Sequence, residues 1–296
     1  MPATALPSIM PLMDGFDAFI LDQWGVLHDG TAAFPAALEA VEHLLAENKV
    51  IVTLSNSGRR AATAEAQMRA MGLPVERFRA NVTSGEAAVG ALQAGEVAGT
   101  ALPGRRCYLL CREGDRSIPD AAGLEVVDDA AAADFVLVAG IHGEVRDLAS
   151  YLAELAPAIE RRLPVVCTNP DRVAVSPGGN VLAPGGVAYA YAEAAGVAPL
   201  FVGKPHRPVY ERCRRALPDV AVPRICAVGD SLEHDVEGAH DAGLATVLCL
   251  DGIHADAFDL GRPARDNLDA VARLAATHGG VEPDYVLTRL AWEIPA

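Results

Sequence analysis

The chain has 296 residues, of which 51% are hydrophobic and 21% are charged, and its formal net charge is −15. This balance supplies enough apolar side chains for a core and excludes intrinsic disorder. The acidic excess would repel nucleic acid and anionic membranes, so we expect neither as a partner. No apolar stretch reaches the roughly 18–20 residues that cross a bilayer. Because the N-terminal region also lacks the pattern of a secretory signal, we expect a soluble, cytoplasmic protein.

Short apolar runs alternate with helical patterns along the chain. Apolar residues between 34 and 45 recur about every 3.6 residues and predict a helix, and Pro208 predicts the start of a second helix through Leu217. Continuous apolar runs, rather than alternating ones, indicate parallel strands that are covered on both faces. The expected strands are residues 17–22, 50–56, 106–111, 134–140, 164–169, 200–203, 224–230 and 245–250. We therefore predict an α/β protein with helices on both sides of parallel sheets.

The six cysteines form no CxxC pair and no cluster with zinc-ligand spacing. Cys107 and Cys111 could form a reactive pair, but reduced and mostly buried thiols are the favoured interpretation. The strongest break in the pattern is the Gly/Pro-rich stretch 176–186, and a weaker one falls at residues 81–86.

Polar side chains stand where the first two apolar runs end. Asp22 closes the first run and is followed by Gly25, a position for a tight turn, although a strand-end aspartate often only caps such a turn. Ser55 and Asn56 close the second run. A helix is expected to begin near Gly58, where free N–H groups would suit a phosphate. A plain helix cap is the alternative for this motif.

Two further motifs follow later strands. Lys204 stands after one apolar run, where a lysine is normally solvated, and Asp230 closes another. Asp235 is expected in the first turn of the next helix, where a carboxylate is favourable whatever its function. In an open α/β sheet the carboxyl ends of the strands form the ligand-binding edge. Two carboxylates that converge there would repel each other, and a hard cation such as Mg²⁺ would relieve that repulsion.

The motifs occur in the order Asp-x-x-Gly, Ser-Asn, Lys-Pro and Gly-Asp-x₄-Asp, which resembles the haloacid dehalogenase superfamily. The segments TSGEAA, TNPDRVAVSPGG, APGGVAYAYAEAAG and VGKPHRPVY are similar to its class IIA branch of NagD-like, pyridoxal phosphatase-like and nitrophenyl phosphatase-like hydrolases. The likeness runs from about residue 16 to about residue 255. It implies a doubly wound, Rossmann-like core domain at 1–82 and 197–296, with an inserted α/β cap domain at 83–196.

The resemblance also implies an activity and a role for each motif. The activity is that of a Mg²⁺-dependent phosphatase, which hydrolyses a small phosphorylated metabolite through an aspartyl-phosphate. Asp22 matches the nucleophile, Ser55 the phosphate-binding hydroxyl and Lys204 the lysine that neutralises the phosphoryl oxygens. Asp230 and Asp235 match the metal ligands that act together with Asp22.

One position departs from the family pattern. Relatives usually have a second aspartate two residues after the nucleophile, which protonates the leaving group, whereas this chain has Trp24. Its backbone carbonyl can still bind the metal, but indole cannot exchange protons near neutral pH. The loss of a general acid costs about 10²–10⁴-fold in rate. His28 and Asp29 are candidates to replace it, although a single loop histidine is more often structural.

Three functions therefore stay open. They are a phosphatase whose leaving group needs little protonation or which uses a substitute acid, a slow or non-hydrolytic phosphate-ester binder with a regulatory role, and a phosphotransferase. Asn56, Trp24, Asn169 and Asp171 are expected to face the substrate, with a simple Pro-Asp turn as the alternative for the last two. Class IIA relatives are often homodimers, so a homodimer is a further expectation. The substrate is left open among sugar phosphates, nucleotides, pyridoxal phosphate and glycerol-type phosphates.

Overall fold

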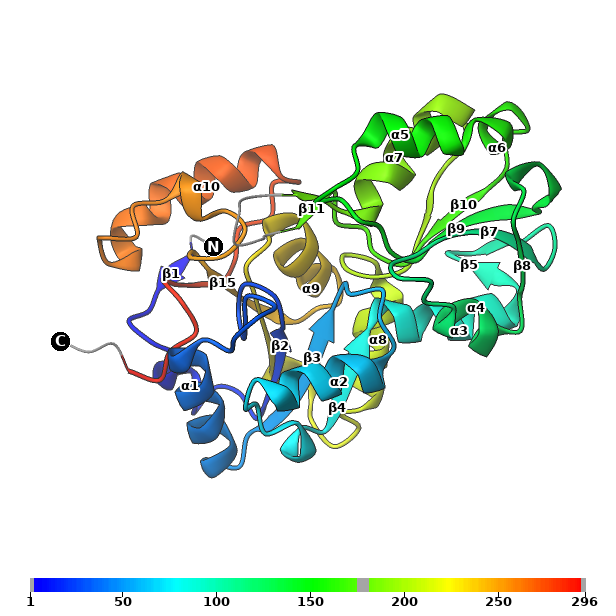
Figure 1. Cartoon of the computed structure of the whole chain (residues 1–296). Helices are drawn as coiled ribbons and strands as arrows, with labels where there is room; N and C mark the ends of the chain where they lie inside the picture. The colour runs from blue at the N-terminus through cyan, green and yellow to red at the C-terminus, as the bar shows by residue number, and fades with distance from the viewer. Residues whose placement is uncertain (1–2, 175–180, 294–296) are drawn as a thin grey trace. The chain divides into compact units, whose positions relative to one another are not determined.

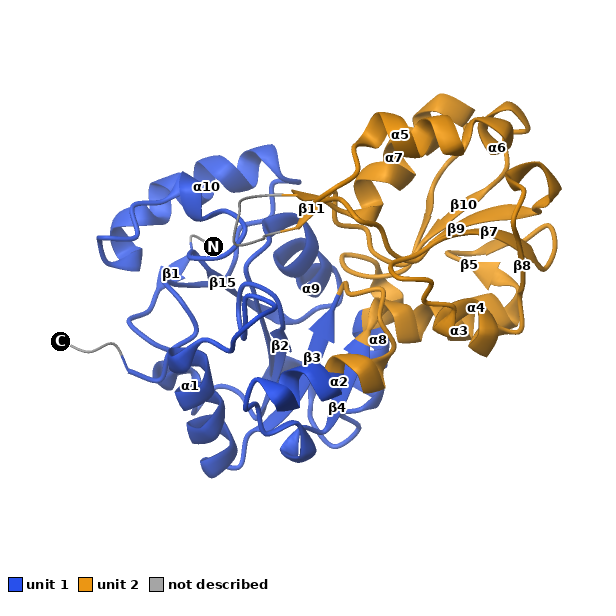
Figure 2. Ribbon diagram, viewed as in Figure 1, with its two compact units in different colours: residues 1–55, 65–82, 210–296 blue, residues 56–64, 83–209 orange. Residues whose placement is uncertain are grey.

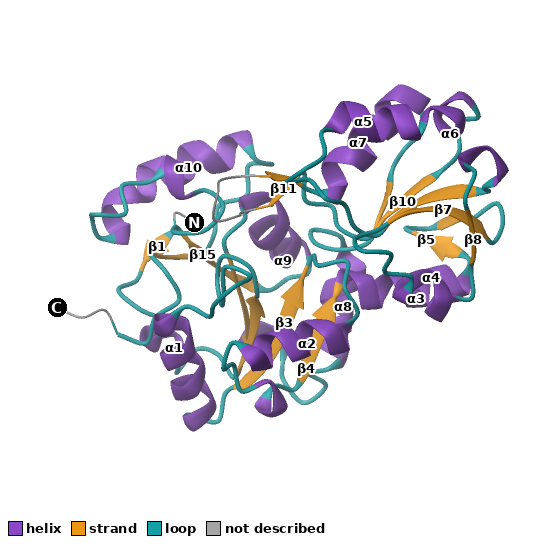
Figure 3. Ribbon diagram, in the orientation of Figure 1, coloured by secondary structure: helices purple, strands orange, loops and turns teal. Residues whose placement is uncertain are grey.

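A computed structural model describes residues 3–174 and 181–293 (Figure 1). The chain divides into two compact units (Figure 2). Unit 1 consists of Met1–Ser55, Glu65–Val82 and Tyr210–Ala296, and unit 2 of Asn56–Ala64 and Thr83–Val209. Both units combine strands and helices, which confirms the predicted α/β class (Figure 3). Residues 176–180 of the Gly/Pro-rich stretch lie outside the described residues.

Unit 1 is built on a seven-stranded sheet whose strands lie in the order β1-β16-β15-β14-β2-β3-β4. The strand β2 pairs in parallel with β3 on one side and with β14 on the other. Because the chain continues from β2 first in one direction and later in the other, the sheet has a topological switch point between β2 and β14. The strands are β1 (Thr4–Ala5), β2 (Ala18–Asp22), β3 (Val50–Ser55), β4 (Ala80–Thr83), β14 (Ile225–Gly229), β15 (Ala245–Cys249) and β16 (Tyr285–Leu287).

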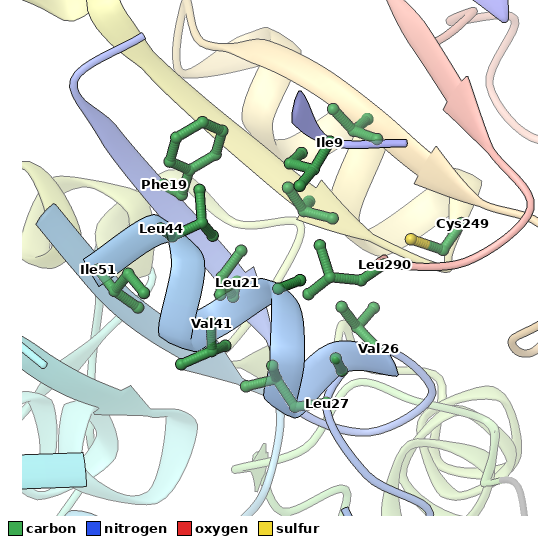
Figure 4. Packing of buried hydrophobic residues seen from close by; sticks show 14 of the residues in the cluster. Ile9, Phe19, Leu21, Val26, Leu27, Val41, Leu44, Ile51, Cys249 and Leu290 are labelled. Carbon is green, nitrogen blue, oxygen red and sulfur yellow. The ribbon is translucent and has the colours of Figure 1, made fainter. Parts of the chain in front are cut away.

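Hydrophobic clusters cover both faces of this sheet. One cluster joins Phe19 and Leu21 of β2 to Val41 and Leu44 of the helix α1 (Pro35–Ala46) (Figure 4). The same cluster includes Met68 of α2 (Ala61–Ala70). The other joins Leu248 of β15 to α10 (Leu268–Thr277). Successive side chains of a strand point to opposite faces, so a continuous apolar run serves two clusters at once. This is the physical basis of the runs seen in the sequence.

Unit 2 has a second parallel sheet, with strands in the order β13-β10-β9-β7-β8. A hydrophobic cluster lies between this sheet and the helices α5, α6 and α7. The strands are β7 (Arg106–Leu110), β8 (Glu125–Val127), β9 (Phe135–Val138), β10 (Val165–Cys167) and β13 (Leu200–Phe201). The helices are α3 (Ser84–Ala94), α4 (Ser117–Ala122), α5 (Leu148–Glu154), α6 (Ala156–Glu160) and α7 (Pro184–Ala195). Two antiparallel pairs complete the unit: β5 (Glu96–Val97) with β6 (Thr100–Ala101), and β11 (Val173–Ala174) with β12 (Val181–Leu182).

All eight predicted strands are present, with ends within two residues of the prediction. The helix after Pro208 is also confirmed as α8 (Arg207–Arg215), although it ends before Leu217. The helix expected near Gly58 is wrong by three residues, because α2 begins at Ala61. The Glu86 carboxylate accepts a hydrogen bond from the backbone N–H of Ala61, and this side chain occupies the helix start. The free N–H groups proposed at Gly58 are therefore not those of a helix N-terminus.

The cysteines agree with the favoured interpretation. All six are free, and five of them are buried. Burial raises the pKa of Cys107 to about 11 and that of Cys167 to about 12, so both stay as unreactive thiols near neutral pH. Among the described residues, no helix is both long and apolar enough to cross a lipid bilayer.

Candidate active site

Three buried carboxylates meet at the carboxyl edge of the unit 1 sheet. Asp22 is the last residue of β2, Asp230 follows the neighbouring strand β14, and Asp235 lies in the π-helical turn Leu232–Val236. One carboxylate oxygen from each lies within 4.8 Å of the others. Adjacent parallel strands bring the first two together, and the turn after β14 returns the third to the same place. The structure thus assembles all three aspartates that the sequence predicted as metal ligands.

Two close backbone approaches fix the Asp230 carboxylate. Gly25 has a φ of +79°, and a Cβ atom there would lie 2.0 Å from Asp230 Oδ2. Gly252 approaches the same oxygen from another segment, where a Cβ atom would lie at 2.1 Å. The backbone N–H of Ile253 donates a hydrogen bond to Asp230 Oδ2 at 2.8 Å. The tight turn predicted at Gly25 is confirmed. A residue without a Cβ atom is needed there because the Asp230 carboxylate occupies that space.

Asp235 is held by the turn that carries it. The backbone N–H of Ser231 donates to Asp235 Oδ2 at 3.2 Å, and the Ser231 hydroxyl accepts a hydrogen bond from the N–H of His234 at 3.2 Å. The Tyr210 hydroxyl donates to the carbonyl of His234 at 2.8 Å and to that of Asp235 at 3.3 Å. The carboxylate is therefore positioned by backbone and capping contacts.

The chemistry of this donor set fits a hard divalent cation. Carboxylate oxygens are the ligands that Mg²⁺ prefers, and three of them in a buried place repel one another unless a cation or protons compensate. Asp22, Asp230 and Asp235 are the residues that would hold the ion.

Trp24 stands two residues after Asp22 and is 37% exposed, whereas His28 is 2% exposed. The two rings lie edge to face, with centroids 5.4 Å apart. The indole also lies against Gly30, where a Cβ atom would be 2.1 Å from Trp24 Cη2. These contacts hold the ring in one orientation while leaving part of it open to solvent.

The two candidates for the missing acid have defined hydrogen bonds. The backbone N–H of Gly30 donates to His28 Nδ1 at 3.0 Å, which leaves Nε2 as the nitrogen that carries the proton in the neutral ring. The carboxylate of Asp29 accepts hydrogen bonds from the N–H groups of Ala32 and Thr31, each at 2.8 Å, and they lower its pKa. Asp29 is therefore an ionised turn cap.

A second group of predicted residues gathers within unit 2. Asn56 and Lys204 are both buried, and the backbone N–H of Lys204 donates to Asn56 Oδ1 at 2.6 Å. The Asn56 amide group donates to Asp171 Oδ1 at 2.7 Å. The side chain of Asn169 accepts a hydrogen bond from the N–H of Asp171 at 2.8 Å, which is the Pro-Asp turn that the sequence allowed. Ser55 is buried at the end of β3 in unit 1.

Sequence reasoning missed the polar residues behind the strand end that carries Asp22. Gln23 donates hydrogen bonds to Thr53 at 3.3 Å and to Asn81 at 2.7 Å, and the Thr53 hydroxyl donates to the same Asn81 oxygen at 2.7 Å. This network links β2, β3 and β4 directly after Asp22. The only sequence signal was a polar residue, Gln23, directly after an apolar run.

Comparison with known proteins agrees with this geometry. The haloacid dehalogenase-like hydrolase family matches residues 19–125, and the HAD-hydrolase-like family matches residues 201–291. Chronophin of Homo sapiens is 31% identical over 247 residues, which cover 79% of this chain and 81% of chronophin. Dihydroxyacetone phosphatase of Corynebacterium glutamicum (strain R) is 29% identical over 267 residues, which cover 87% of this chain and 90% of that protein.

Solved structures give the same result. A hydrolase of the haloacid dehalogenase-like family from Brucella suis 1330 has a TM-score of 0.81 at 29% identity, covering 97% of this chain and 100% of that chain. Structures described as nitrophenylphosphatases and as a putative nagD protein share the fold. The chain therefore belongs to the haloacid dehalogenase-like hydrolase family, within its class IIA branch of phosphatases.

Proposed function

We propose that this phosphatase depends on Mg²⁺ and hydrolyses a small phosphorylated metabolite through an aspartyl-phosphate on Asp22. The observation that carries the proposal is the buried group of Asp22, Asp230 and Asp235 at the carboxyl edge of a parallel sheet. Of these three residues, only Asp22 both ends a strand at the switch point and begins the Asp-x-x-Gly motif.

The reaction has two displacements at phosphorus. First, an oxygen of the Asp22 carboxylate attacks phosphorus, and the bond from phosphorus to the ester oxygen breaks with its electron pair on that oxygen, which takes up a proton. Second, water attacks the same phosphorus and loses a proton, and the bond to Asp22 breaks. Inorganic phosphate leaves and the carboxylate is restored. A carboxylate suits this role because its acyl phosphate is readily hydrolysed.

The other residues of the proposed site neutralise the negative charge of the substrate, directly or by binding the metal ion. Bound Mg²⁺ would neutralise phosphoryl oxygens, which matters for an anionic substrate in a chain of net charge −15. Asp22, Asp230 and Asp235 would hold the ion, and the backbone carbonyl of Trp24 would be a further protein ligand. Lys204 neutralises the phosphoryl oxygens whose repulsion otherwise keeps the nucleophile away.

The remaining contacts determine which ester is bound. The hydroxyl of Ser55 binds the phosphate, with Asn56 beside it. We assign the selection of the organic part to Trp24 and to a cap domain formed by residues 83–196, in which Asn169 and Asp171 lie in the TNPD turn. The relative named dihydroxyacetone phosphatase supports a small substrate, so three-carbon phosphates belong in the first panel alongside sugar, nucleotide and pyridoxal phosphates.

The decisive experiment compares the wild type with Asp22→Asn in the presence of Mg²⁺, scored by phosphate release. Asn has the shape of Asp without the attacking charge, so turnover should fall to background while substrate binding survives. Asp14→Asn serves as the matched control, since Asp14 is an exposed aspartate before the other end of β2 and should keep full activity. Substantial turnover by purified Asp22→Asn protein would show that Asp22 is not the nucleophile.

Slow turnover or ligand binding without hydrolysis is the second candidate function. It is supported by Trp24 in place of the family's second aspartate, and by Asp29, whose lowered pKa keeps the carboxylate ionised and unable to donate a proton. A binder of this kind would bind phosphate esters in a Mg²⁺-dependent way and release negligible phosphate even from aryl esters, whose leaving groups need no acid.

A further inference from the structure

The side-chain amide of Asn56 is buried, with 4% of the residue exposed, and its hydrogen-bonding capacity is fully used by the protein. Its Oδ1 accepts from the backbone N–H of Lys204 at 2.6 Å and from the Ser84 hydroxyl at 3.3 Å. Its Nδ2 donates to Asp171 Oδ1 at 2.7 Å and to the carbonyl of Lys204 at 3.2 Å. An asparagine side chain offers two donors and two acceptor positions, and all four have partners here.

The partners of this amide come from three distant segments of unit 2. Lys204 follows β13, Asp171 lies in the TNPD turn after β10, and Ser84 begins α3. The backbone before the lysine passes close to the amide, because a Cβ atom on Gly203 would lie 2.6 Å from Asn56 Oδ1 and 2.5 Å from Ser84 Oγ. Gly203 also has a φ of +137°, a backbone conformation that glycine adopts more readily than other residues.

We infer that Asn56 is a positioning residue for Lys204. Its amide group holds the backbone of Lys204 by two hydrogen bonds and connects it to Asp171 of the TNPD turn by a third. The inference rests on the proposed function, in which Lys204 neutralises the phosphoryl oxygens. Both backbone groups of Lys204 bond to one side chain, so the amide fixes the point from which the lysine side chain extends. Electrostatic stabilisation of a transition state depends on such preorganised positions, because a charge that must first be ordered contributes less.

This role differs from direct contact with substrate, which was the expectation from the sequence. A substrate oxygen could bond to Asn56 only by displacing one of its four partners, and each displaced buried group would lose a hydrogen bond. A substrate ligand mainly affects KM. A positioning residue that acts through the lysine affects kcat, and its effect disappears when the lysine is absent.

The test is a double-mutant cycle with Asn56→Ala, Lys204→Ala and the double variant, assayed with phenyl phosphate and Mg²⁺. We expect Asn56→Ala to lower kcat by about 10–100-fold, less than the loss of a full transition-state donor, with KM changed by less than about threefold. In the Lys204→Ala background the same change should lower kcat by less than about twofold. Equal losses with and without Lys204, or a loss confined to KM, would overturn the inference.

A reciprocal exchange tests the link to Asp171 independently. Asn56→Asp keeps the acceptor for the Lys204 N–H but sets a second carboxylate against Asp171, so kcat should fall. Adding Asp171→Asn reverses donor and acceptor, and kcat should recover at least tenfold relative to Asn56→Asp alone. No recovery in a folded double variant, judged by circular dichroism and thermal unfolding, would contradict the inference.

The matched control is Asn267→Ala in unit 1. This asparagine is also 4% exposed, and its amide bonds to the backbone N–H and carbonyl of Asp259 at 2.8 and 3.0 Å. Its loss should lower the unfolding temperature and leave kcat within about twofold of the wild type. If the wild type releases no phosphate from any ester, the proposed function fails and the inference fails with it. An active wild type with additive losses overturns only the inference.

Discussion

The identity of the leaving group should decide how fast this enzyme turns over, because of Trp24. The ring stands two residues after Asp22, the proposed nucleophile, and its N–H cannot act as an acid near neutral pH. Phenol has a pKa of about 10, as in tyrosine, and leaves without protonation more easily than an alkyl alcohol, whose pKa approaches that of water at about 15.7. We expect the wild type to hydrolyse phenyl phosphate well and glycerol phosphate barely.

The substitution Trp24→Asp separates the two consequences of the ring. A carboxyl group supplies the missing acid, which contributes about 10²–10⁴-fold in favourable cases, so kcat for glycerol phosphate should rise by up to about 100-fold. The exposed part of the indole is also available for stacking on an aryl ester. Stacking contributes about 0.5–1.5 kcal/mol beyond burial, so KM for phenyl phosphate should rise by about 2–13-fold in the same variant.

The assay is steady-state release of phosphate from both esters by the wild type, Trp24→Asp and Trp24→Leu. The leucine variant removes the ring without adding a proton donor, so it should raise KM for the aryl ester and leave the alkyl ester slow. Equal kcat/KM for the two esters in the wild type, with a pre-steady-state experiment showing that chemistry limits the rate, would refute the reasoning. A substitute proton donor would then be tested first with His28→Ala, and Asp29→Asn, which changes an ionised turn cap, would serve as the comparison.

Three further predictions concern metal binding and stability. Asp230→Asn should weaken Mg²⁺ binding by at least about tenfold without unfolding the protein, because one of three buried carboxylate charges is lost. Titration calorimetry measures the Mg²⁺ affinity, and an unchanged affinity would show that Asp230 is not a metal ligand. Gly30→Ala should lower the free energy of unfolding by about 1–3 kcal/mol, since its φ is +88° and the new Cβ would meet the Trp24 ring. Gly72 has a φ of +91° and open space around it, so Gly72→Ala measures the backbone contribution alone. If urea titrations show that both variants lose the same free energy of unfolding, contact with the Trp24 ring is not the cause. Burial lowers the pKa of His254 to about 4 in the folded state, below its ordinary 6.5, so its contribution to stability is full above pH 6.5 and is lost as the pH falls towards 4. His254→Gln should therefore flatten the dependence of the unfolding temperature on pH between these values, and an unchanged dependence would contradict the prediction.

The class of fold and the identity of the chemical groups could be predicted from the amino-acid sequence. Continuous apolar runs such as residues 17–22 and 224–230 predicted buried parallel strands, because a strand covered on both faces needs apolar side chains at every position. The strand-end positions of Asp22 and Asp230 followed directly from these runs. The short strands β4 and β16 escaped prediction, since three or four residues carry too little periodicity to be distinguished from a loop.

Which of these groups lie together, and which hydrogen bonds each one makes, could be seen only in the folded structure. The carboxylates converge because β14, which begins about 200 residues after β2, pairs beside it in the sheet. Asn56 had the same sequence signal as a phosphate ligand, but its partners lie 28, 115 and 148 residues away along the chain. Local patterns report on local conformation and burial. Hydrogen bonds between distant segments depend on how sheets and loops are brought together, so the use of this amide could be seen only in the folded chain.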